Sequence, residues 1–141
     1  MIARTTRLCP ECFGQEIDGL CCRGMLALVT SWEWGNPKLG AKHFEIVSSF
    51  LIQHPSQYED KAIQSLRVML RRHLDEGLPV DRIRKIHGDL FAGRTRVRAD
   101  EGNTVIQPRE WPITVSYVYV GGPDEALERV NRWVTCVRSG L

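Results

Sequence analysis

Apolar residues recur at spacings of three and four along most of the chain, which is the period of an amphipathic helix. The clearest stripe is formed by Leu127, Val130, Val134 and Val137, and it follows Pro123 at a typical first helical position. Four earlier stripes predict helices that end at Gly35, Pro55, Gly77 and Gly93. The pattern therefore predicts a mainly α fold, a small helical domain of about five helices.

Typical capping residues stand at three of the predicted helix starts. Asn36 precedes Pro37, and this pair suits the cap and the first position of a helix. Ser56 and Glu59 have the spacing of a capping box before the third helix. Gly122 stands at the expected cap of the last helix. We therefore expect helices to begin at these positions.

Residues 94–120 lack a helical stripe. They are mostly polar and are interrupted by Gly102, Asn103, Pro108 and Pro112, which predicts a long irregular segment before the last helix. Within it, residues 113–120 alternate as a strand would, with 104–106 as the available partner, while Thr114 equally suits the cap of a short helical turn. We expect a single domain, 1–141, with a metal-binding knuckle (1–24), a helical core (25–93), a connecting segment (94–120) and a C-terminal helix (121–141).

Length and composition exclude several classes of protein. A chain of 141 residues can bury a core without disulfides. Its net charge of +2 is close to neutral. The longest apolar stretch, 25–29, is too short for a transmembrane helix, and no apolar run follows the basic N-terminus as in a signal peptide. These features predict a cytoplasmic protein. In a reducing compartment its five cysteines are more typical of metal ligands or free thiols than of disulfides.

The cysteines near the N-terminus have the spacing of a zinc site. Cys9 and Cys12 form a C-x-x-C knuckle, and Gly14 favours the tight turn that directs both thiolates to one point. Cys22 lies where a helix begins, and the positive end of a helix favours a thiolate. Its neighbour Cys21 is expected to point away. A redox pair would open a helix after a strand, and no such pattern surrounds this motif.

The fourth ligand is expected to be His54, with His43 as the alternative. Eleven residues of helix separate the two histidines by about 16 Å, so they cannot bind the same ion. If the first two helices form an antiparallel hairpin, His54 lies at the same end as Cys22. The predicted cofactor is zinc, with iron as the main competitor. Four protein ligands would make the site structural, since they leave no coordination position for water.

Several short motifs accompany these ligands. They are Cys9-Pro10-x-Cys12, Cys22, Glu33, Pro37, Gly40-Ala41-x-His43, Val47, Gln53-His54-Pro55 and Ile63-Gln64-Ser65. Together they resemble an uncharacterised bacterial family of small proteins that open with CPxC and carry an HxxxV…QHP helix followed by IQS. The resemblance covers residues 9–78 and implies no activity. Family members tend to have an aspartate where this chain has Ser48 and a histidine where it has Met69, so a catalytic site built on those groups would be incomplete here.

Three functions fit the sequence. The first is a zinc-stabilised binding module with a protein partner, because a closed ligand set offers no catalytic position. The second is an enzyme that uses Glu33, His43 and His54 for proton transfer between the first helices. The third is nucleic-acid binding, although the basic residues are expected to be a solvated helix surface. These residues are Arg67, Arg71, Arg72, Arg82, Arg84, Lys85, Arg94, Arg96 and Arg98.

Overall fold

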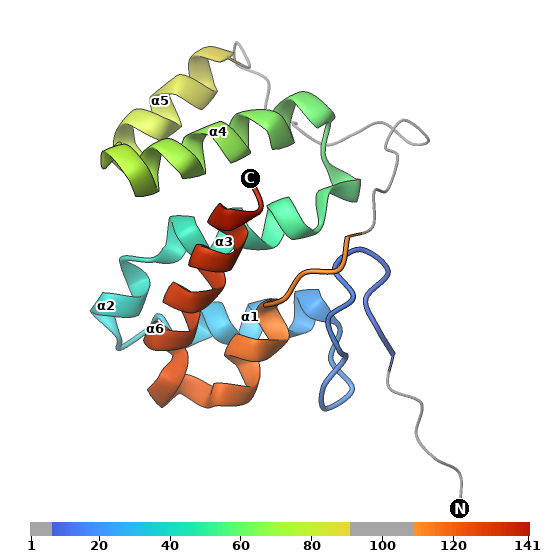
Figure 1. Ribbon diagram of the computed structural model, residues 1–141. Coiled ribbons are helices and arrows are strands. Elements are labelled where there is room, and N and C mark those ends of the chain that lie inside the picture. Colours follow the sequence, from blue (N-terminus) through green and yellow to red (C-terminus); the bar gives the residue numbers. More distant parts are fainter. Residues whose placement is uncertain (1–6, 91–108) are drawn as a thin grey trace, which may run out of the picture.

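The computed structural model describes residues 7–90 and 109–141, and this part of the chain is mainly helical and without β-strands (Figure 1). The α-helices are α1 (Cys22–Ser31), α2 (Pro37–Gly40), α3 (His43–Gln53), α4 (Asp60–Glu76), α5 (Val80–Leu90) and α6 (Val115–Ser139). A 3-10 turn, η1 (Pro55–Gln57), joins α3 to α4. The predicted mainly α fold is confirmed. No helix in the described part is long and apolar enough to cross a membrane.

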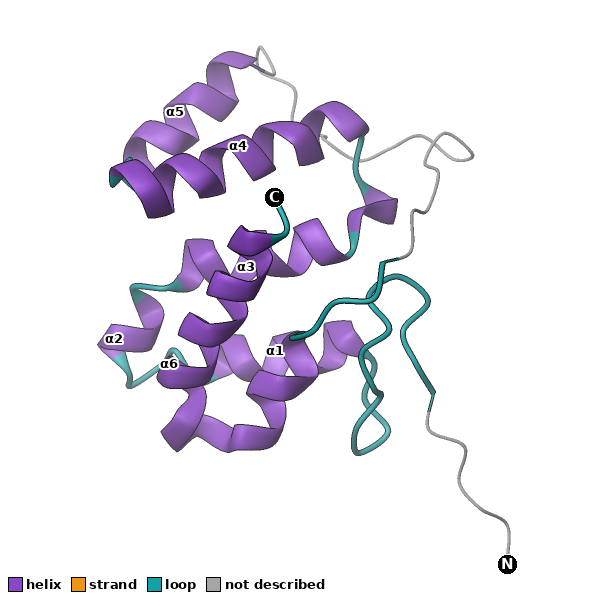
Figure 2. Cartoon of the chain, viewed as in Figure 1, coloured by secondary structure: helices purple, strands orange, loops and turns teal. Residues whose placement is uncertain are grey.

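The core lies where α6 packs across α1 and α3 (Figure 2). Helix α4 covers α3 on another side, and α5 packs on α4. The large apolar side chains that are fully buried in the described part are Met25, Val29, Leu39, Ile46, Leu70, Val115, Val118, Val130, Trp133 and Val137. Three of the four residues of the stripe predicted for the last helix are buried, so the period of that helix is confirmed.

Gln53 ties the end of α3 to two other parts of the chain. Its Nε2 donates a hydrogen bond of 2.8 Å to the carbonyl oxygen of Ile113, and its Oε1 accepts one of 3.0 Å from Nε1 of Trp133. Gln53 is only 1% exposed, and a buried amide must find partners of this kind. The two bonds fix the end of α3, directly before His54.

Residues 115–120 are helical, so the expected irregular segment extends too far toward the C-terminus. Thr114 is the N-cap residue of α6, as the helical alternative requires, although its side chain makes no capping bond. Gly122 interrupts α6 with φ 75° and ψ 178°, and Pro123 begins its second part. A positive φ is readily available only to glycine, so Gly122 allows the kink. Residues 94–108, including the proposed strand 104–106, lie outside the described part.

One predicted helix is divided in the structure. The helix expected from Pro37 to Pro55 is divided into α2 and α3, which fits the low helix propensity of Gly40. Asn36 does cap α2, because its Oδ1 accepts a hydrogen bond of 3.2 Å from the amide of Leu39.

The capping box of Ser56 and Glu59 is not formed. Glu59 is itself the N-cap residue of α4 and makes no side-chain cap bond, while Ser56 belongs to η1. At the other end of α4, Gly77 has φ 72°, so the predicted end of this helix is confirmed. Gly93, the predicted end of the next helix, lies outside the described residues.

Candidate metal centre

The candidate site begins with a knuckle, residues 7–21, which has two isolated β-bridges and no longer strand. The amide of Cys9 donates to the carbonyl oxygen of Gly14 at 2.8 Å, and the amide of Phe13 donates to that of Cys9 at 2.9 Å. The positive φ in this turn belongs to Phe13, at 62°, and not to Gly14. Gly14 is needed for space, because a Cβ there would lie 2.5 Å from Oγ1 of Thr114. Its amide donates to the sulfur of Cys12 at 3.3 Å.

Four side chains bring potential ligand atoms together, and this cluster can hold a metal ion. They are Cys9, Cys12, Cys22 and His54, whose ligand atoms all lie within 4.8 Å of one another. The sulfurs of Cys12 and Cys22 are 3.7 Å apart. Tetrahedral zinc with Zn–S bonds of about 2.3 Å requires about 3.8 Å between two sulfurs. The spacing of this pair therefore fits the geometry of a zinc ion.

His54 is oriented as a metal-binding histidine would be. It is the C-cap residue of α3 and is 8% exposed. Its Nδ1 lies 2.7 Å from the carbonyl oxygen of Phe50, which can only accept a hydrogen bond, so Nδ1 carries the proton. The lone pair is then on Nε2, which is buried and has no hydrogen-bond partner in the described structure. Metal-bound histidines typically donate their other ring nitrogen in this way.

The three sulfurs do not ionise equally. The hydrogen bond with Cys22 lowers the pKa of Cys12 to about 4. The same bond, together with burial and the charge on Cys12, raises the pKa of Cys22, and burial raises that of Cys9. Without a cation, ionisation of Cys12 is therefore favoured over ionisation of its two neighbours. A divalent cation would remove this conflict, because it stabilises all three thiolates at once.

Contacts beyond the cluster fix the knuckle to the helical part of the molecule. Oε1 of Glu11 accepts a hydrogen bond of 3.0 Å from the amide of Ser56, two residues after His54. The carbonyl oxygen of Glu11 accepts one of 3.0 Å from the amide of Arg109, and the guanidinium of Arg109 lies 4.0 Å from the ring centre of Trp111. Nothing in the sequence pattern identifies Glu11, because its partners are 45 and 98 residues away in the chain.

The remaining candidates lie elsewhere. Cys21 is exposed and outside the cluster. His43 is also outside it, and its Nδ1 lies 2.9 Å from both carboxylate oxygens of Glu33. The structure thus brings Glu33 and His43 together but leaves His54 at the other end of α3, so the three do not form one proton-transfer site.

The basic residues considered for nucleic-acid binding are partly engaged within the molecule. Arg72 pairs with Glu76 at 3.5 Å, and Arg67 donates to the carbonyl oxygen of Gly140 at 3.5 Å. Three others, Arg94, Arg96 and Arg98, lie outside the described residues. The described part of the chain therefore offers no additional support for a phosphate-binding stripe.

Comparison with known proteins identifies a family whose function is unknown. A model of a family of unknown function (DUF5946) matches residues 7–141, which includes the whole cluster. No curated protein and no solved structure matches the chain.

Proposed function

The chain belongs to this family of unknown function, and we propose that it is a zinc-stabilised helical binding module. The observation that carries the proposal is the convergence of Cys9, Cys12, Cys22 and His54, with the unpartnered Nε2 of His54 among the sulfurs. The resemblance expected from the sequence motifs agrees with the family match, and neither supplies an activity.

Zinc suits this set of donors best. Three thiolates and one imidazole are a common ligand set of tetrahedral structural zinc sites, while calcium and magnesium prefer oxygen. Iron also binds sulfur-rich sites, and it remains the competitor that the experiment must exclude. A reducing cytoplasm, which we propose as the location, would keep the cysteines available for metal binding.

The role of the ion would be structural. Four protein ligands complete a tetrahedral site and leave no position for a reacting water. The ligands come from the knuckle, the first residue of α1 and the residue that ends α3. An ion there would join these three segments by bonds to their side chains. The resulting unit would be a rigid helical surface with a fixed knuckle at one end.

Metal analysis of tag-free protein tests this proposal. The wild type should contain one zinc per chain after gel filtration, and His43→Gln should contain the same amount. His54→Gln should lose most of the metal, because it removes one of the four ligands of a tetrahedral site. Iron in place of zinc, or equal zinc in the His54 and His43 variants, would overturn the assignment.

An exposed aromatic residue supports the idea of a protein partner. Trp34, in the turn after α1, is 88% exposed, whereas Trp32 stacks on Tyr119 with ring centres 6.3 Å apart. Tryptophan is enriched among residues that dominate binding energies at protein interfaces. A photo-crosslinking amino acid at position 34 should give a discrete protein adduct in cells, and the same probe at the exposed Lys38 should not. A smear shared by both positions, or no adduct, would contradict a partner at this turn.

A further inference from the structure

A second candidate site lies at the opposite end of α3 from His54. A cavity of about 390 Å³ opens between the turn from α2 to α3 and helices α4 and α5. His43, at the first position of α3, is on its wall. Helix α3 separates this cavity from the candidate metal centre by about 16 Å, at 1.5 Å per residue. A ligand in this cavity would therefore not contact the candidate metal ligands.

The interior of this cavity is apolar. Its apolar lining consists of Ala41, Phe44, Val47, Leu66, Val80 and Ile83. Pockets for small molecules typically have volumes of about 300–1,000 Å³ and an apolar lining with a few polar groups. The cavity thus has the size and lining of a small ligand site, and it would favour a ligand with a hydrocarbon body.

The polar groups at its edge are mostly basic. Arg84, on α5, is exposed and forms no ion pair with any described residue. His43 also lines the cavity, and its Nδ1 is already engaged by Glu33, at 2.9 Å from each carboxylate oxygen. His87 is half-buried, and its Nε2 lies 3.5 Å from Oγ of Ser65. None of the residues that line the cavity is acidic, so an anionic group would meet Arg84 without a competing carboxylate on the wall.

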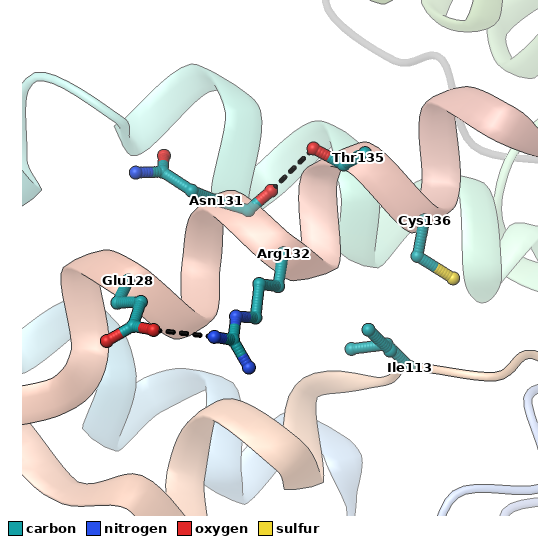
Figure 3. A pocket seen from close by; sticks show the side chains of 6 residues that line it. All are labelled: Ile113, Glu128, Asn131, Arg132, Thr135 and Cys136. Atoms are coloured by element: carbon teal, nitrogen blue, oxygen red, sulfur yellow. Dashed lines mark hydrogen bonds and ion pairs between the residues drawn. The ribbon is translucent and has the colours of Figure 1, made fainter.

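Another hollow on the surface is larger but chemically different. It has a volume of about 500 Å³ and runs along α6, between Ile113 and residues that include Cys136 (Figure 3). The charged groups on its wall neutralise each other, because Arg132 and Glu128 form an ion pair of 2.7 Å. It offers no unpaired charge to a ligand and a single half-buried thiol.

We propose that the cavity between α3, α4 and α5 binds a small amphipathic anion, such as a medium-chain carboxylate. The hydrocarbon chain would occupy the space beside Phe44, Val47 and Ile83, and the carboxylate would bind the guanidinium of Arg84. Arginine presents donors that match a carboxylate in two places, which makes it well suited to this role. The site is separate from the proposed zinc centre and does not depend on it.

Titration calorimetry with octanoate tests the proposal, and octan-1-ol and octylammonium serve as matched neutral and cationic probes. The metal-replete wild type should bind octanoate saturably and with higher affinity than either. Arg84→Gln should weaken octanoate binding by about tenfold and leave octan-1-ol binding unchanged, because only the charge-assisted hydrogen bonds are lost. Arg82→Gln, on the same helix but outside the cavity, should behave as the wild type.

A second variant tests the location independently of charge. Ala41→Trp replaces an exposed residue at the wall and should obstruct the cavity, so that octanoate and octan-1-ol both fail to bind, while circular dichroism shows an unchanged fold. No saturable binding of octanoate to the folded wild type would overturn the proposal. Equal octanoate affinities in the Arg84 and Arg82 variants would also overturn it, because the anion would then not be held by Arg84.

Discussion

The knuckle and the helical body of this protein are stabilised in different ways. In the body, α1, α3 and α6 enclose side chains such as Met25, Ile46 and Trp133, all with no measurable exposure. In the knuckle, residues 7–21, Cys12 is the only buried apolar side chain, while Leu8 and Phe13 are 54% and 41% exposed. Burial of apolar surface therefore accounts for the body but not for the knuckle.

This difference shows what a metal ion would contribute. A segment of 15 residues with two isolated bridges cannot offset the entropy of its own ordering by apolar burial. Three of the four candidate ligands belong to the knuckle or to the residue that follows it, and the fourth ends α3. We expect the knuckle to depend on the metal and the body to depend on its core, and the following predictions separate these two dependences.

The largest effect is expected from Cys22→Ala, which removes a ligand shared by the knuckle and α1. The variant should lose the metal and about 5 kcal/mol or more of unfolding free energy, because metal binding is coupled to folding. Amide exchange should lose protection at Phe13 in the knuckle and keep it at Val130 in α6. Cys21→Ala is the control and should change neither metal content nor stability. Retained protection at Phe13 in the metal-free variant would remove the distinction between the regions.

Metal affinity should depend steeply on pH. The pKa of Cys12 is lowered to about 4 and those of Cys9 and Cys22 are raised, so at pH 7 the ion displaces a proton from each of the latter two. Two protons released per ion make affinity rise about 100-fold per pH unit, or about 10⁴-fold from pH 6 to pH 8. Calorimetry in buffers of different ionisation enthalpy counts these protons. Affinity that does not change with pH would contradict this ionisation pattern.

The same shifts have opposite effects on the metal-free fold. The lowered pKa of Cys12 contributes stability that is lost as pH falls toward about 4, and the raised pKa of Cys22 contributes stability that is lost above its usual value of 9.0. The stability of the metal-free knuckle should therefore be highest near pH 9, and fall on either side of it.

A change in the core of the body should lower stability without removing the metal, in contrast to Cys22→Ala. Trp133→Ala should lower the unfolding free energy by about 3–5 kcal/mol, because it leaves a cavity at a side chain that is fully buried. Below its unfolding temperature the variant should still bind one metal ion per chain. Trp34→Ala, at a side chain that is 88% exposed, is the matched control and should change stability little. Loss of the metal from folded Trp133→Ala would show that the two regions are not separable.

The smallest effect is expected where the regions meet. Glu11→Ala removes the carboxylate that accepts a hydrogen bond from the amide of Ser56, and should cost about 1 kcal/mol. It should also weaken metal binding slightly, because this bond holds the knuckle beside His54. Glu16→Ala serves as the control, since the side chain of Glu16 makes no hydrogen bond in the described structure. Thermal unfolding without a chelator and with one measures the stability of the metal-bound and the metal-free protein. Equal losses of stability in the Glu11 and Glu16 variants would contradict a specific role for Glu11.

Local patterns in the sequence were sufficient for much of the fold and for the cluster. The stripe ending in Val137 and the cap at Asn36 depend on neighbouring residues, and the structure has both. The geometry of a helical hairpin favours His54 over His43, and the structure brings His54 to the three cysteines. Helix period and the spacing of the cysteines are short-range properties, whereas the choice of His54 also depends on how two helices are arranged.

Features that depend on distant contacts could not be predicted in this way. The capping box at Ser56 is not formed, and the amide of Ser56 instead bonds to Glu11, 45 residues earlier in the chain. The alternation after Thr114 suggested a strand as readily as a helix, and packing of Val115 and Val118 into the core accompanies the helix that is found. Gly14 was expected to serve a turn, but the nearby side chain of Thr114 requires it instead.

X-ray absorption at the zinc edge tests the central claim most directly, because it identifies the ligands without altering them. We predict three sulfur atoms at about 2.3 Å and one nitrogen atom at about 2.0 Å, with the nitrogen contribution lost or replaced by another light atom in His54→Gln and unchanged in His43→Gln. A shell of four sulfurs, a shell dominated by oxygen and nitrogen, or no zinc in the purified protein would contradict the Cys9, Cys12, Cys22 and His54 site.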